Sequence, residues 1–163
     1  MKTYKLAAIT VVLGALAFTS HAALSGNITI SGTVGNNTRI VVEPMAPYND
    51  LDIDGGETDT KVATVTERCN KKGGYTVTLR SENATASQAF LKGTGSNEDV
   101  VNYSMTYGGI AVTLASGVGT VTDTTARTTG QGVAKDLNVT IGTGGWYDED
   151  TYSDTLTLTI AAK

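Results

Sequence analysis

The sequence is very poor in histidine and cysteine, and both shortages limit the chemistry that the protein can carry out. Its one histidine is His21 and its one cysteine is Cys69. If the N-terminal segment is removed, as argued below, no histidine is left for a Ser-His or Cys-His nucleophile pair or for a histidine metal site. Asp148 and Asp150 form a carboxylate pair, but nothing marks them as an acid and a base. We therefore expect no enzyme and no cofactor.

The sequence also has no basic stripe and, beyond its first residues, no long apolar run. The formal net charge is −4 and becomes more negative once Lys2 and Lys5 are removed. Nucleic acid and anionic membrane surfaces are therefore not expected as partners. No later stretch is apolar enough to cross a bilayer, so we expect no membrane insertion.

The first 22 residues have the pattern of a secretory signal peptide. Lys2 and Lys5 precede a mostly apolar run at residues 6–18, and Ser20-His21-Ala22 supplies the small residues that a signal peptidase reads. We predict cleavage after Ala22 and export. Roughly 140 residues then remain, which suits one domain with its own hydrophobic core. Because that domain has a single cysteine, it cannot form an intramolecular disulfide, so its stability must come from its core or from assembly.

Most of the remaining sequence alternates between apolar and polar residues, which is the period of a β-strand. Thr and Val are abundant, and Gly-rich turns separate the runs. Residues 84–91 are long enough for one helical turn, and nothing longer has a helical pattern. The expected strands are residues 39–43, 60–69, 74–81, 100–107, 110–114, 133–141 and 153–162. This number and spacing of short strands predicts an all-β, immunoglobulin-like β-sandwich.

Residues 23–34, "ALSGNITISGTV", alternate without a break but have no hairpin partner nearby. One face is rich in hydroxyl groups. The other face carries the apolar residues and glycines: Leu24, Gly26, Ile28, Ile30, Gly32 and Val34. The segment is either the first strand of the chain's own sandwich or a strand donated to another molecule.

Two longer segments resemble the spore coat U and Csu-type pilin domains, which belong to the chaperone–usher fimbrial subunits. Residues 62–81, "VATVTERCNKKGGYTVTLRS", are similar to the strand–Cys–turn–"YTV" segment of that family. Residues 150–163, "DTYSDTLTLTIAAK", resemble its closing strand, and residues 51–65 stand where the family has an earlier strand and loop. The sequence departs from the family in lacking a second cysteine near residues 39–54 and an aromatic residue near its end.

The resemblance implies a structural subunit of a surface pilus, or fimbria, that supports adhesion or biofilm formation. Such subunits are incomplete sandwiches that a periplasmic chaperone shields and an outer-membrane usher assembles by donor-strand exchange. Residues 23–36 would then be the donor extension and residues 37–163 the sandwich. The donor contacts would be Leu24, Gly26, Ile28, Ile30, Gly32 and Val34, and the acceptor groove beside the closing strand would be lined by Leu156, Leu158 and Ile160.

Two other motifs leave alternative functions open. Asp50, Asp52 and Asp54 match the first half of a calcium-binding loop, although Lys61 stands where the bidentate glutamate is expected. Trp146-Tyr147, followed by three acidic residues, is typical of either a sugar-binding surface or an ordinary loop. The alternatives are therefore a self-complete sandwich adhesin that binds carbohydrate or calcium, and a coat or matrix protein that assembles without an usher.

Overall fold

The computed structural model describes residues 28–95 and 97–163. Its contacts divide the chain into two units, Met1–Thr33 and Val34–Lys163. Every regular element of the described residues is a β-strand and lies in the second unit. The predicted signal peptide and the donor residues Leu24 and Gly26 lie outside the described residues.

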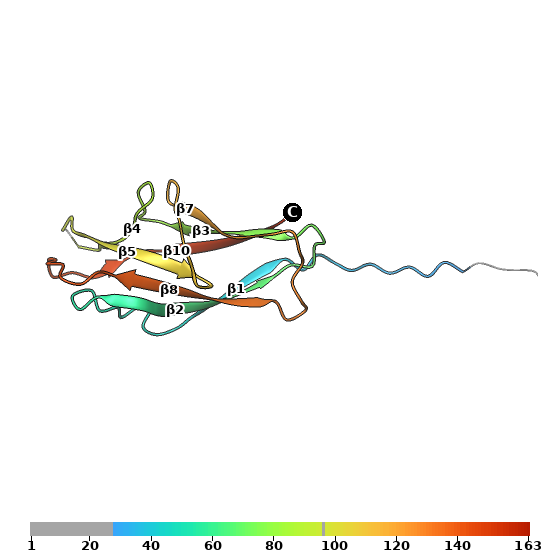
Figure 1. Cartoon of the computed structure of the whole chain (residues 1–163), viewed down its shortest axis with the longest axis horizontal. Helices are drawn as coiled ribbons and strands as arrows, with labels where there is room; N and C mark the ends of the chain where they lie inside the picture. Colours follow the sequence, from blue (N-terminus) through green and yellow to red (C-terminus); the bar gives the residue numbers. More distant parts are fainter. Residues whose placement is uncertain (1–27, 96) are drawn as a thin grey trace, which may run out of the picture. The chain divides into compact units, whose positions relative to one another are not determined.

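The second unit consists of two antiparallel sheets that pack as layers (Figure 1). The larger sheet has the order β1-β2-β8-β5-β4-β9, with β6 paired to β5, and the smaller sheet has the order β10-β3-β7. The strands are β1 (Arg39–Pro44), β2 (Glu57–Arg68), β3 (Tyr75–Ser81), β4 (Ala89–Gly93), β5 (Val100–Tyr107), β6 (Ile110–Ala111), β7 (Val118–Thr124), β8 (Val133–Ile141), β9 (Tyr152–Ser153) and β10 (Leu156–Ala162). The predicted all-β, sandwich-like fold is confirmed.

The alternation read from the sequence explains the core between the sheets. On β3, Val77 and Leu79 are both 0% exposed, while the alternating Thr76 and Thr78 are half-buried on the other face. Val65 on β2 and Val101 on β5 are equally buried and face them from the larger sheet. Because each buried aliphatic side chain contributes roughly 1.5–3 kcal/mol, these inner rows hold the layers together.

For several elements, the predicted type or bounds were wrong. The helical turn expected at residues 84–91 is instead a tight turn closed by Thr85 and Gln88, followed by strand β4, because Ala89 and Leu91 are buried with period two. Residues 110–114 form only the short strand β6. The closing segment divides into β9 and β10 around Asp154, whose carboxylate accepts hydrogen bonds from the backbone amides of Asn83 and Thr155.

Strand β7 was not predicted, and its composition explains why. It reads "VGTVTDT", with small and polar residues where a strand in the core has large apolar ones. Gly119 is required there because a Cβ atom would lie 2.6 Å from the backbone oxygen of Thr113. Tertiary pairing with β3, rather than local propensity, therefore places this segment in the sheet.

A buried carboxylate links the two sheets from within. Glu67 on β2 is 0% exposed, and it accepts hydrogen bonds from the hydroxyl groups of Tyr75 at 2.8 Å, Tyr107 at 2.7 Å and Thr122 at 2.7 Å. The ammonium group of Lys135 lies 3.4 Å from the same carboxylate. These four partners offset the desolvation of the buried charge.

Candidate functional site

The sandwich is open along one side, between the edge strands β1 and β10. In the described residues β1 is paired only with β2, and β10 is paired only with β3. Each strand therefore has one edge whose backbone N–H and C=O groups have no ladder partner, which is the usual template for adding a strand. β1 and β10 approach each other across the opening.

These two edge strands run in opposite directions. β1 begins at Arg39, which is opposite Arg68 at the end of β2. β10 ends at Ala162, which is opposite Tyr75 at the beginning of β3. Because the short turn at residues 69–74 joins Arg68 to Tyr75, β1 begins and β10 ends at the same end of the sandwich. A strand inserted between them would be parallel to one and antiparallel to the other.

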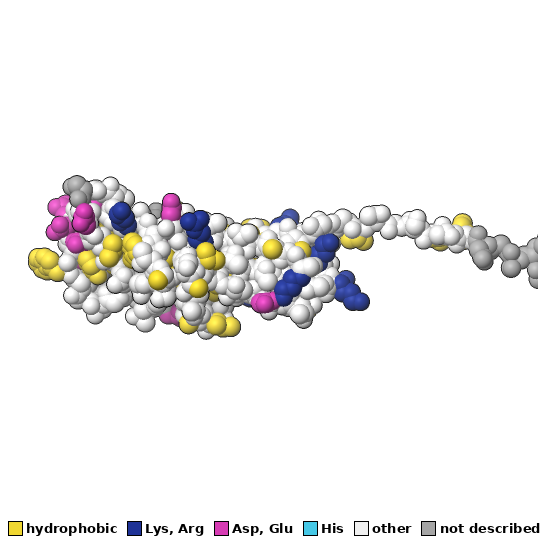
Figure 2. Space-filling view, turned by 90° about the horizontal axis from the view of Figure 1, so that it is seen from above, with side chains coloured by type: hydrophobic (Ala, Val, Ile, Leu, Met, Phe, Trp, Pro, Cys, Tyr) yellow, Lys and Arg dark blue, Asp and Glu magenta, His cyan; other side chains and the backbone are white. Residues whose placement is uncertain are grey.

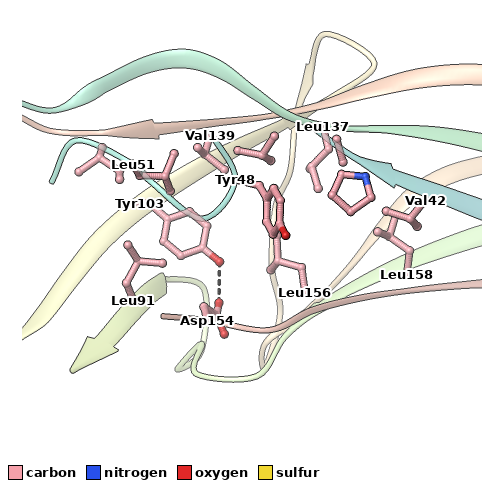
Figure 3. Close-up of a pocket in the computed structure, with 14 residues that line it drawn as sticks. Val42, Tyr48, Leu51, Leu91, Tyr103, Leu137, Val139, Asp154, Leu156 and Leu158 are labelled. Atoms are coloured by element: carbon pink, nitrogen blue, oxygen red, sulfur yellow. Dashed lines mark hydrogen bonds between the residues drawn. The ribbon is translucent and has the colours of Figure 1, made fainter. Parts of the chain in front are cut away.

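An apolar groove of about 200 Å³ lies in this opening. Figure 3 shows Leu156 and Leu158 on one side of it and Leu137 and Val139 on the other, with Tyr48 between them. The lining residues come from both sheets: Val42, Pro44, Tyr48, Leu51, Val62, Ala63, Leu91, Tyr103, Leu137, Val139, Ile141, Asp154, Leu156 and Leu158. The groove thus exposes part of the sandwich interior.

The inward-facing side chains of β10 are covered much less than those of its neighbour. Leu158 pairs with Leu79 on β3, but Leu79 is 0% exposed whereas Leu158 is only half-buried. Leu156 and Ile160 are half-buried as well. Leu156 and Leu158 line the groove, whereas Ile160 packs against Cys69, Tyr75 and Val77 near the end of the sandwich and is not among the lining residues.

The one charged group in the groove is fully engaged with its own chain. The carboxylate of Asp154 accepts hydrogen bonds from the hydroxyl groups of Tyr103 at 2.5 Å and Ser81 at 2.6 Å, in addition to the two backbone amides named above. Burial and this hydrogen bond to Asp154 raise the pKa of Tyr103. Since the groove offers no unpaired charge, it suits an apolar occupant.

The described part of the N-terminal segment forms no strand. Ile28 and Ile30 are 86% and 89% exposed, Val34 is 88% exposed, and Gly32 has no atom near the position of a Cβ. Such exposure is unusual for two isoleucines and a valine that alternate with polar residues. Within the part of the chain that the structure describes, Ile28, Ile30 and Val34 are therefore apolar side chains that nothing covers.

The side chain of Asn70 holds the beginning of the second unit. Its amide nitrogen donates to the carbonyl oxygen of Gly35, and its amide oxygen accepts from the backbone N–H of Asn37, both at 2.8 Å. Thr38 follows, with its hydroxyl 3.5 Å from the sulfur of Cys69. These contacts attach residues 35–38 to the turn between β2 and β3. Cys69 itself is a free, buried thiol.

The two motifs that left other functions open lie in one surface cleft, a proximity that the sequence did not reveal. Asp52 and Asp54 line it from the loop after β1, and Tyr147, Asp148 and Glu149 line it from the loop before β9. The carboxylate of Asp52 accepts the backbone N–H of Gly55, as in a simple turn. No group of acidic, histidine or cysteine side chains suited to a metal ion occurs within residues 28–95 and 97–163. Trp146, which precedes Tyr147 in the sequence, is 97% exposed, and neither Trp146 nor Asp50 is among the residues that line the cleft.

Comparison of the sequence with models of known protein families gives no match, and comparison with curated proteins gives none either. Within the part of the chain that the structure describes, no helix is long and apolar enough to cross a membrane.

Proposed function

We propose that this protein is a structural subunit of a surface pilus and that it polymerises by donating residues 23–34 to the groove of a neighbouring copy. The observation that carries the proposal is a complementarity within one chain. An apolar groove lies between two unpaired strand edges, and an N-terminal segment exposes apolar residues at alternate positions. β-strand addition uses these two elements, with backbone hydrogen bonds along the edge and pockets for alternate side chains.

The dimensions of the two elements are compatible. From Leu24 to Val34 an extended segment spans about 33 Å, whereas β10 with its seven residues spans about 20 Å. The donor is thus long enough to cover all the inward-facing side chains of β10. Burying Leu24, Ile28, Ile30 and Val34 is worth on the order of 1.5–3 kcal/mol each, and each new backbone hydrogen bond adds roughly 1 kcal/mol.

The half-exposed groove also supports protective partners before assembly as part of the proposal. A subunit that leaves an apolar groove and two sheet edges open is prone to aggregate. The family resemblance supplies the proposed protection, a periplasmic chaperone, and the proposed assembly site, an outer-membrane usher. The proposed location is therefore the periplasm during export and the cell surface afterwards, where the pilus would support adhesion or biofilm formation.

The experiment that tests the proposal adds the donor in trans. A variant that lacks residues 1–34 would be refolded with a peptide of residues 23–34, and its thermal unfolding would be followed by circular dichroism. We expect the peptide to bind and to raise the unfolding temperature, and a peptide with Ile28→Asp and Ile30→Asp to do neither. If the truncated protein is equally stable with both peptides, the proposal is wrong.

A further inference from the structure

The two ends of the sandwich carry exposed charge of opposite sign. At the end where β1 begins, Arg39, Lys71, Lys72 and Arg127 are exposed around the turn between β2 and β3. At the other end, Asp52, Asp54, Asp148 and Glu149 are exposed around the cleft that Tyr147 also lines. We call these the basic end and the acidic end. Figure 2 shows a cluster of acidic side chains at one end of the sandwich and several basic side chains at the other, with further charged side chains of both signs elsewhere on the surface.

The separation of charge has no evident use within one molecule. β2 runs from Glu57 near the acidic end to Arg68 at the basic end, so the ends lie about 35 Å apart along this strand. The Debye length at physiological ionic strength is about 8 Å, so the two ends do not attract each other within one copy. Among the described residues, the ion pairs involve none of the eight side chains that define the ends.

The connection between donor and sandwich brings two copies close together. Only residues 35–38 separate Val34 from the beginning of β1, and Asn70 fixes this linker at the basic end. Such a linker spans at most about 17 Å. When residues 23–34 lie in a neighbour's groove, the basic end of the donor's own sandwich must therefore lie close to one end of that neighbour.

The direction of the donor decides which end that is. If the donor runs parallel to β1, it leaves the groove at the acidic end of the neighbour, and opposite charges meet. If it runs parallel to β10, it leaves at the basic end, and like charges meet at a cost. We infer that the acidic end of one copy docks on the basic end of the next, so that charge fixes the direction of the donor and speeds assembly. This inference rests on the proposed function.

The test reverses single charges at each end of the full mature chain. We expect Lys72→Glu and Glu149→Lys each to slow polymerisation several-fold at low salt, measured by light scattering and by fibre length in electron micrographs. The double variant, in which the two ends have exchanged a charge, should polymerise faster than either single variant. The matched controls are Arg80→Glu and Glu82→Lys, which make the same changes of charge on and just after β3, beside Thr155 and Thr157 rather than among the residues that define the two ends.

Salt and the donor peptide separate the two hypotheses. High salt should remove the differences between the variants, because it screens exposed charges. Peptide 23–34 should bind to the truncated forms of all the variants with unchanged affinity. If the peptide binds but the end variants polymerise like the controls, the docking of the ends is refuted and the donor mechanism stands. If the peptide does not bind to the unmodified groove, the proposed function fails instead.

Discussion

Replacing Leu158 with aspartate tests whether the groove is the acceptor site. Leu158 lies on the inner face of β10, lines the groove and is half-buried while the groove is open. Covering the rest of this side chain with a donor strand is worth about 1 kcal/mol, because full burial of leucine contributes 1.5–3 kcal/mol. An aspartate would lose this gain and would place an unpaired carboxylate under the donor, at a cost of at least about 2 kcal/mol.

The expected loss for Leu158→Asp is therefore about 3 kcal/mol, or about 150-fold in affinity for the donor. The assay is calorimetric titration of peptide 23–34 into the truncated, refolded protein. Thr159→Asp is the matched control, because it introduces the same charge at the next position of β10, on the exposed outer face. Circular dichroism would verify that both variants fold. An affinity for Leu158→Asp within threefold of that of the control would refute the assignment of the groove.

Three further predictions concern the stability of the sandwich. Glu67→Gln should lower the free energy of unfolding by about 3 kcal/mol, because the charge that pairs with Lys135 is lost inside the core. Urea unfolding measures this free energy, and a change below about 1 kcal/mol would contradict the prediction. Burial and the hydrogen bond to Glu67 raise the pKa of Tyr107 above 10.0, so the unfolded chain loses this proton first as the pH rises. Stability should therefore fall above pH 10 by about 1.4 kcal/mol per pH unit for this group, and Tyr107→Phe should show a shallower decline in alkaline unfolding. Thr38→Cys should form a disulfide with Cys69 and stabilise the protein by about 3.5 kcal/mol through a loop of some 30 residues, an effect that a reductant must abolish.

The sequence predicted the fold well wherever one face of a strand is buried. β3, β5 and β8 lie where the alternation indicated. Because their apolar residues stand at every second position, only one face of each strand can pack against the core. β7 was not predicted because its inner face includes Gly119 in place of a large apolar residue. A glycine is needed there because the backbone near Thr113 lies too close for a Cβ atom. A requirement of this kind comes from tertiary packing and has no signature in local composition.

The candidate site was predictable only in part, for a related reason. The closing strand and its apolar row could be recognised from alternation, but the other wall of the groove comes from β2, β5 and β8, which are far apart in the sequence. Tyr48 lies in an irregular loop, and nothing near it indicates a place beside the groove. The cleft that joins Asp52 to Asp148 depends in the same way on two loops that only the fold brings together.

The open groove and the unpaired cysteine bear on the same question, which is where the stability of the protein comes from. The inward-facing side chains of β10 stay half-exposed although the inward-facing residues of its neighbour β3 are buried, and Cys69 has no partner sulfur in the described residues. A single copy of the chain therefore leaves part of its hydrophobic stabilisation unrealised. If a donor strand covers those side chains, the gain appears only on assembly. The polymer should then resist unfolding at temperatures and denaturant concentrations that unfold the isolated subunit, and the subunit should be most vulnerable between export and incorporation.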